Sequence, residues 1–75
     1  MPDPWIAIEE RALAIVAEVA KRQPLDRAEL ERALQVFAIA KNRDLEQTMP
    51  NMSVFDDDKL VPMVEALVQG NRLGG

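Results

Sequence analysis

The sequence predicts an all-α fold, namely a small three-helix domain with two longer helices in an antiparallel hairpin and a shorter third helix. Three observations predict it. Apolar residues recur at helical spacing in three segments, capping or breaking residues bound these segments, and no useful length alternates as a strand would. At 75 residues the chain has room for a single domain, 1–75, with one thin core. Assembly as a dimer would add stability, and the sequence leaves that open.

The first helix is expected over about residues 4–22. Asp3 can serve as its N-cap, and Pro4 suits the first helical position, where a missing N–H costs nothing. At about 100° per residue, the apolar side chains cover roughly half of the helix circumference. They are Trp5, Ile6, Ile8, Ala12, Leu13, Ile15, Val16 and Val19. Glu9 is the exception, because it projects from inside this apolar arc.

The start of the second helix is the best-defined boundary in the chain. Pro24 disfavours helical geometry at the residue before it, so the first helix must end there. Asp26 and Glu29 have the spacing of a capping box, and Leu25 and Leu30 have the spacing of a hydrophobic staple. Two independent local signals therefore predict the same starting point.

The second helix is expected over about residues 27–48. Its main apolar face carries Leu30, Ala33, Leu34, Phe37, Ala38 and Leu45. Lys41 and Asp44 rotate into this face, and Asp44 could cap a separate short turn. The helix therefore either continues to Thr48 or breaks near Asn42, and we expect it to continue.

The third helix is expected over about residues 57–69. Three aspartates, residues 56–58, place negative charge at its N-terminal end, where the helix dipole favours it. Pro62 fits only near the start of this helix, or with a kink. Gly70 is expected to end the helix as its C′ residue, and residues 70–75 are expected to form a flexible tail.

The side chains that most catalytic and metal sites need are missing. The chain has no cysteine and no histidine, which excludes disulfides, thiolate nucleophiles and the usual zinc and haem ligands. An EF-hand loop starting at Asp56 would need Gly and Glu where the chain has Val61 and Leu67. The hydroxyl groups of Thr48 and Ser53 have no histidine to activate them. We therefore expect no enzyme, no metal and no cofactor.

The expected location is the cytoplasm. No stretch approaches the roughly 20 apolar residues of a membrane span, and the N-terminal residues lack the basic start of a secretory signal. The net charge is −4, and the aspartates that open the third helix would repel nucleic-acid phosphates. Nucleic acid and membrane are therefore not the expected partners.

The strongest candidate for an interaction surface is a stripe on the far side of the second helix. It consists of Arg32, Val36, Ile39 and Arg43. Arginine and apolar side chains recur at the centres of protein interfaces. The same residues could instead belong to the core, if the second helix lies between the other two helices, and the sequence does not separate these alternatives. Trp5 and Phe37 are further expected anchors for a partner.

Glu9 is expected to form a buried ion pair, because a lone carboxylate in an apolar arc needs a partner. Arg32 and Arg43, of the same or another chain, are the expected partners. The alternative is that Glu9 acts as a general acid, as buried carboxyl groups can.

The expected function is that of a non-enzymatic protein–protein interaction module, such as a small adaptor, regulatory subunit or inhibitor. It would act through apolar helix faces on a protein partner, with a homodimer as the expected assembly. One alternative is a small dimeric DNA-binding transcriptional regulator that uses the arginines of the second helix. Another is a virus- or mobile-element-encoded inhibitor that occludes a host protein.

Overall fold

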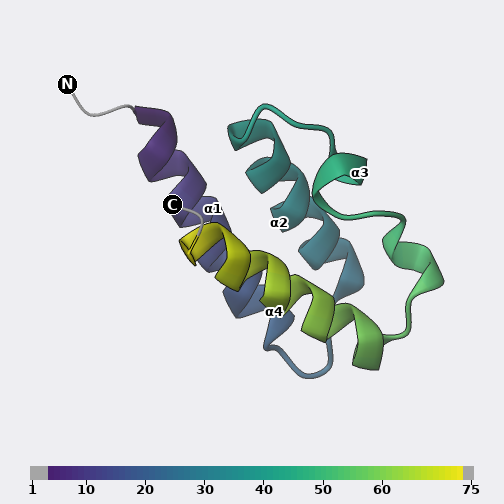
Figure 1. The fold of residues 1–75 in the computed structure, drawn as a ribbon. Coiled ribbons are helices and arrows are strands. Elements are labelled where there is room, and N and C mark those ends of the chain that lie inside the picture. The colour runs from purple at the N-terminus through teal and green to yellow at the C-terminus, as the bar shows by residue number, and fades with distance from the viewer. Residues whose placement is uncertain (1–3, 74–75) are drawn as a thin grey trace.

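The described residues form an all-α fold, as predicted, but with four α-helices rather than three (Figure 1). The computed structural model describes residues 4–73, and no strand occurs among them. In chain order the elements are α1 (Pro4–Ala20), α2 (Arg27–Ala40), α3 (Leu45–Thr48), the 3-10 helix η1 (Met52–Val54) and α4 (Asp57–Leu73). α1 and α2 form the predicted antiparallel hairpin, and α4 runs antiparallel to α1 across it (Figure 1).

The turn of the hairpin forms where the sequence predicts it. The Asp26 side chain accepts a hydrogen bond from the backbone N–H of Glu29, with 3.1 Å between Oδ1 and N. The Glu29 carboxylate lies 2.6 Å from Nη1 of Arg22, so an ion pair joins the two ends of the turn. Leu30 is fully buried and Leu25 packs against the same core. The cap and the staple therefore fix where α2 begins.

α1 ends at Ala20, two residues before its predicted end. Its last turn tightens, because the N–H groups of Lys21 and Arg22 donate to carbonyls three residues back, those of Glu18 and Val19. The predicted N-cap of α1, Asp3, lies outside the described residues.

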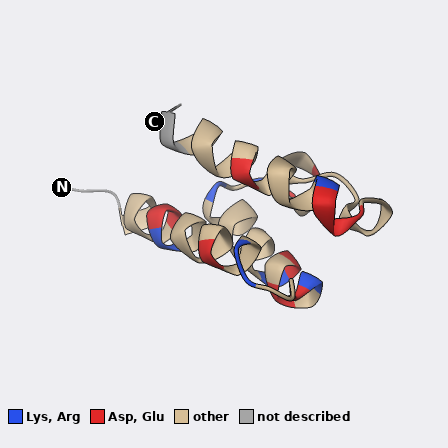
Figure 2. Ribbon diagram, turned by 90° about the horizontal axis from the view of Figure 1, so that it is seen from below, with Lys and Arg blue, Asp and Glu red and all other residues tan. Residues whose placement is uncertain are grey.

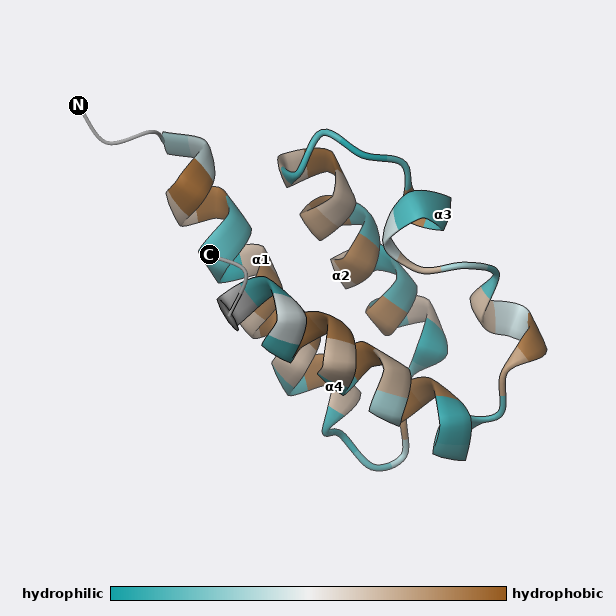
Figure 3. Ribbon diagram, in the orientation of Figure 1, coloured by the Kyte–Doolittle hydropathy of each residue, from teal (hydrophilic) through white to brown (hydrophobic). Residues whose placement is uncertain are grey.

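The second helix breaks near Asn42, so the prediction that it continues to Thr48 is wrong. α2 ends at Ala40, and Asn42 adopts a φ of 57°, a left-handed conformation that asparagine tolerates better than most residues. A continuous helix would turn the charges of Lys41 and Asp44 into its apolar face, at the cost of their hydration. Figure 3 shows that the chain between α2 and α3 is hydrophilic.

Two backbone hydrogen bonds close this end of α2 as a Schellman motif. The N–H of Arg43 donates to the carbonyl of Ala38 at 2.9 Å, and the N–H of Asn42 donates to the carbonyl of Ile39 at 3.0 Å. These bonds satisfy carbonyls that the broken helix would otherwise leave open. The chain resumes as α3, which brings Leu45 against the core.

The connector between α3 and α4 is tied to the hairpin by Arg27, in the first turn of α2. Its Nη2 donates a hydrogen bond to the carbonyl of Met52, and its Nη1 lies 3.6 Å from Oδ1 of Asp57. Met49 is buried, and Phe55 packs against the core. One arginine thus links the starts of α2 and α4 through the connector.

α4 is longer than predicted, and the expectation that it ends at residue 69 is wrong. Gly70 lies inside the helix instead of at its C′ position, and residues 70–73 are helical instead of forming a flexible tail. The side-chain amide of Asn71 donates to the carbonyl of Leu67 at 2.8 Å. A glycine inside a helix costs only about 1 kcal/mol, which the next turn's backbone hydrogen bonds can offset. Gly74 and Gly75 lie outside the described residues.

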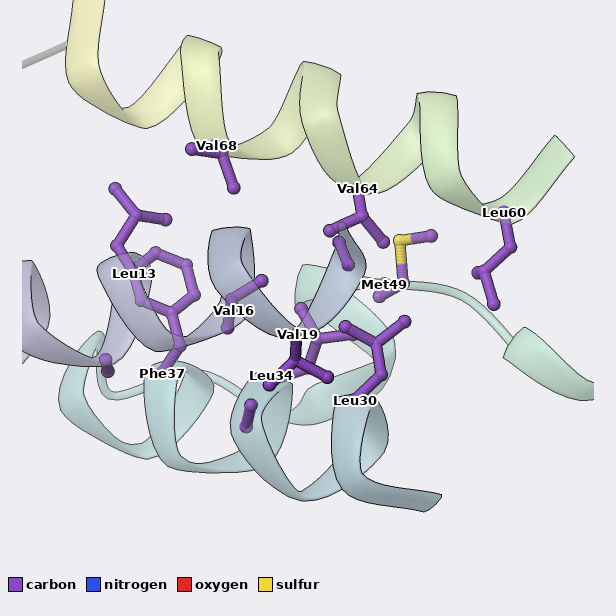
Figure 4. Close-up of a cluster of buried hydrophobic side chains, with 13 residues drawn as sticks. Leu13, Val16, Val19, Leu30, Leu34, Phe37, Met49, Leu60, Val64 and Val68 are labelled. Atoms are coloured by element: carbon purple, nitrogen blue, oxygen red, sulfur yellow. The ribbon is translucent and has the colours of Figure 1, made fainter. Parts of the chain in front are cut away.

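The core lies between α4 and the hairpin. Figure 2 shows α4 in one layer and α1 and α2 in the other. Side chains from both layers meet in Figure 4, among them Leu13 and Val16 of α1, Leu34 and Phe37 of α2, and Leu60, Val64 and Val68 of α4. No polar or charged residue is buried among the described residues. α4 therefore covers one side of the hairpin with a purely apolar contact.

Replacing Gly70 with alanine tests where α4 ends. An added Cβ would meet no heavy atom within 4 Å, and alanine loses less backbone freedom than glycine on folding. We therefore expect the free energy of unfolding to rise by about 0.5–1 kcal/mol. Urea denaturation, monitored by circular dichroism, measures the free energy of unfolding. A decrease of that size would place Gly70 in a left-handed C′ conformation and would contradict the extended helix.

Candidate interaction surface

The side of the α1–α2 hairpin turned away from α4 carries apolar side chains that remain half exposed. Ile8 and Ile15 of α1 are each 44% exposed, whereas Val36 and Ile39 of α2 are 52% and 62% exposed. We call this side, with the charged residues around them, the open face. It consists of Ile8, Arg11, Ile15, Glu18, Arg22, Glu29, Arg32, Val36, Ile39 and Arg43.

The helical positions of Ile8 and Ile15 place them opposite α4. Ala17 lines the same surface hollow as Val64 and Val68, so α4 runs along the Ala17 side of α1. At about 100° per residue, Ile8 and Ile15 lie roughly 160–180° around α1 from Ala17. The buried side chains of the hairpin point toward α4 in Figure 4. Ile8 and Ile15 therefore belong to the opposite face.

The position of α2 decides between the two alternatives for its far-side stripe. Val36 lies about 160° around the helix from both Leu34 and Ala38, and these two residues are buried. All four residues of the stripe, Arg32, Val36, Ile39 and Arg43, are exposed. The stripe is therefore external to the core of this chain, because α2 lies beside α1 and not between α1 and α4.

Two ion pairs show how the helices of the hairpin are aligned. Lys41 Nζ lies 3.3 Å from Glu9 Oε2 near one end, and Arg22 pairs with Glu29 near the other. In each pair the two residue numbers sum to 50 or 51 (9 with 41, 22 with 29). Residues of α1 and α2 whose numbers have this sum therefore lie level with each other.

This alignment brings the open-face residues of the two helices together. Ile15 lies level with Val36, whereas Ile8 lies level with Arg43 and Ile39 lies level with Arg11. Glu18 lies level with Arg32, but no ion pair within 4 Å joins these two described residues. The open face thus has an apolar centre with charges beside it.

Within this chain, the partner of Glu9 differs from the arginines predicted for it. Its carboxylate pairs with Lys41 and not with Arg32 or Arg43, because those arginines lie on the open face and Glu9 does not. The pair is only partly buried, with 25% of the Glu9 side chain and 32% of the Lys41 side chain exposed. It stands in a groove of about 450 Å³ at the end of the hairpin, lined by Ile6, Glu9, Glu10, Leu13, Phe37, Lys41 and Asn71.

The two aromatic anchors predicted for a partner have different environments. Phe37 is only 2% exposed and packs beside Leu13 in the core, so it cannot serve as an anchor (Figure 4). A partner would reach it only by unpacking the core. Trp5 is about half exposed at the start of α1, and its role in partner binding stays a prediction.

The open face is basic although the chain is acidic. It carries four arginines and two glutamates, a formal charge of +2. The whole chain has 9 basic and 13 acidic residues, so the remainder has 5 and 11, a formal charge of −6. Three of the remaining acids are the aspartates 56–58 that open α4, in red in Figure 2. Charge is therefore segregated over the surface, which favours oriented association.

Other kinds of site have little support in the described part of the chain. Among residues 4–73, no group of three or more acidic side chains is arranged to hold a metal ion. None of the described helices combines the length and apolar character needed to span a membrane. No family model, curated protein or solved structure matches this chain. The functional inference therefore depends on the geometry of the open face.

Sequence reasoning missed the α1 half of the open face. It assigned Ile8 and Ile15 to one continuous apolar arc, together with buried residues such as Val16. A signal was present, because Ile8 and Ile15 are seven residues apart and lie at one edge of that arc. That edge faces away from Ala17. Knowledge of the side on which α4 packs would therefore have separated Ile8 and Ile15 from the buried residues of α1.

Alanine substitutions at neighbouring positions test the division between core and open face. We expect Phe37→Ala to lower the free energy of unfolding by about 3–5 kcal/mol, because it leaves a cavity in the core. Val36→Ala should change it by less than about 1 kcal/mol, because Val36 is exposed in the single chain. Urea denaturation at protein concentrations too low for association measures the free energy of unfolding of both variants. Losses of equal size would contradict the assignment of Val36 to the surface.

Proposed function

We propose that this chain is a non-enzymatic protein–protein interaction module that binds a protein partner through the open face. The observation that carries the proposal is that Ile8, Ile15, Val36 and Ile39 remain 44–62% exposed on one face of two paired helices. Apolar residues that stand singly on a surface need no explanation, but several large ones on one face, interspersed with arginines, are typical of a binding site.

The energy available from this surface suits binding. Fully burying an isoleucine or valine side chain contributes about 1.5–3 kcal/mol relative to leaving it exposed. The four side chains are about half exposed, so covering them would contribute roughly 1 kcal/mol each. Arginine stems at the rim would add packing, because their methylene groups can lie along apolar surface. Small chains often complete their burial through such assembly.

A homodimer is the simplest form of this assembly, because a two-fold interface uses the same patch on both copies. The roles of adaptor, regulatory subunit and inhibitor are all compatible with an apolar docking face, and the identity of the partner would decide among them.

The location that we propose for the chain is the cytoplasm.

The alternative of a DNA-binding regulator has weaker support. Arg32 and Arg43 lie on a basic face, which phosphates would favour. However, Val36 and Ile39 lie between them, half exposed, where a DNA-binding surface would carry polar groups. α4 would be the natural reading helix in a three-helix arrangement, and its first turn is acidic. We therefore favour a protein partner.

Site-specific cross-linking in the cells that naturally produce the chain tests this function. A photoreactive amino acid replaces Ile15 or Val36 in the full chain, and a matched variant carries it at Gln69, an exposed position of α4. We expect discrete protein cross-links from Ile15 and Val36 and none of the same mass from Gln69. Electrophoresis followed by mass spectrometry identifies the products. Equal products from all three positions, or none from the open face, would contradict the proposal.

A further inference from the structure

The same residue pattern occurs on both helices of the open face. In α1, Arg11 comes four residues before Ile15, and the residue four positions after Ile15 is fully buried. In α2, Arg32 comes four residues before Val36, and the residue four positions after Val36 is also buried. Four residues correspond to a rotation of about 40° around a helix. On each helix, the half-exposed apolar side chain therefore lies between a buried side and an arginine.

The buried side of each helix faces the other helix. α4 lies on the opposite side of the hairpin, so the neighbouring helix is what buries the edges of the open face. Ile15 and Val36 therefore lie on the two sides of the line along which α1 and α2 contact each other, which we call the seam. Arg11 and Arg32 lie farther from the seam, one at each outer edge of the open face.

The two edge arginines are also separated along the hairpin. Arg32 lies level with Glu18, and Glu18 comes seven residues after Arg11 in α1. Seven helical residues span about 10 Å, or roughly two turns. The open face thus presents an apolar seam with one arginine on each side of it, two turns apart.

Neither edge arginine is engaged within the described part of the chain. No ion pair joins Arg11 or Arg32 to another described residue, whereas Arg22 is already paired with Glu29. An exposed guanidinium without an acidic partner can bind a carboxylate of another molecule with two parallel hydrogen bonds. Arg11 and Arg32 are therefore the cations of the open face that a partner can use.

The other charges on and beside the open face do not cancel these arginines. Glu18 is the one unpaired acid among the open-face residues, and it is already counted in the formal charge of +2. Arg43 shares a surface hollow of about 310 Å³ with Asp44, which offsets the charge of Arg43 locally. The face remains positive even when Asp44 is counted with it, so it is complementary to an acidic partner.

The covered side of the hairpin shows what shape fits a layer of two helices. There a single 17-residue helix, α4, packs over the apolar side chains of the hairpin (Figure 2). The open face offers a second platform of the same kind, along the 14 residues of α2 or about 21 Å. A helix laid along the seam would bring its apolar stripe over Ile15 and Val36. The residues that border this stripe would then meet Arg11 and Arg32.

We propose that the open face binds an amphipathic helix of a partner protein, in which acidic side chains border the apolar stripe on both sides. The apolar stripe covers the seam, and the acidic borders pair with Arg11 and Arg32. Amphipathic helices commonly bind in this way, with anchors at helical spacing. Complementary charges at the edge favour the correct register and exclude partners of the wrong sign.

This proposal rests on the proposed function and names the chemistry of the partner. A second copy is the weaker occupant, because two open faces carry charge of the same sign and repel each other. Self-association therefore needs a high protein concentration, and the acidic helix displaces the second copy.

Synthetic peptides of about 18 residues test the chemistry of the partner. An acidic probe carries leucine at helical spacing with glutamate along both borders of the leucine stripe. A basic probe has lysine in place of each glutamate, and a shuffled probe keeps the acidic composition without the helical spacing. We expect the acidic probe to bind the full chain at least about tenfold more tightly than either other probe. Fluorescence anisotropy of the labelled probes measures the dissociation constants.

Reversing the two edge arginines should reverse the preference. In the Arg11→Glu, Arg32→Glu double variant, we expect the basic probe to bind more tightly than the acidic probe. The Arg11→Gln, Arg32→Gln double variant removes the charges without reversing them. It should bring the two dissociation constants to within about threefold of each other. Both arginines are exposed, so circular dichroism should show unchanged helicity in both variants.

A matched variant separates the edge arginines from the net charge of the chain. Lys21→Glu with Lys59→Glu makes the same change in net charge at two exposed positions outside the open face. At about 0.15 M ionic strength the Debye length is about 8 Å, so these distant charges are screened. The dissociation constant of the acidic probe should stay within about threefold of the value for the natural chain.

An acidic probe that binds no more tightly than the shuffled or the basic probe would overturn the proposal. A double Arg→Glu variant that keeps the natural preference would do the same. If the open face still gives cross-links to a protein or to a second copy in either case, the acidic helix is wrong and the proposed function stands. If those cross-links are also missing, both fail.

Discussion

The rest of the structure depends on a geometric constraint: two antiparallel helices form a layer with two faces, and α4 can cover only one of them. The covered side is purely apolar, with Val16, Leu34 and Val64 among its fully buried residues. The described residues, 4–73, form no further long helix that could cover the second side, because α3 is four residues long. Ile15 and Val36 therefore remain half exposed on a hairpin that is otherwise well packed.

The break at Asn42 determines which side remains open. Because α2 ends there, the chain passes through α3 and η1 beside α2, and Arg27 ties this connector to the start of α4. α4 then runs back along α1 on the Ala17 side. A continuous second helix would deliver α4 from a different point. The local conformation of one asparagine thus bears on the location of the candidate interaction surface.

Local signals in the sequence predicted the helix class, the start of α2 and the buried face of α2, because caps and helical spacing act over a few residues. The end of α2 was missed because a left-handed Asn42 competes with helix continuation, and the balance depends on how Lys41 would be buried. Gly70 was read as a helix end, although a glycine inside a helix costs little. Helical periodicity placed Phe37 on the buried face of α2 without excluding the anchor role expected for it, and it did not separate Ile15 from the buried residues of α1. Exposure depends on where α4 packs, which helical periodicity does not encode.

The most direct test of the central claim is the solvent access of the open face as the protein concentration rises. Methyl NMR with a soluble paramagnetic agent measures that access separately for Ile15, Val36 and Val54, which is 70% exposed on η1. We expect the methyl groups of Ile15 and Val36 to become protected at high concentration while those of Val54 remain accessible. Unchanged access at Ile15 and Val36, or equal protection at Val54, would contradict an open face that binds a second copy.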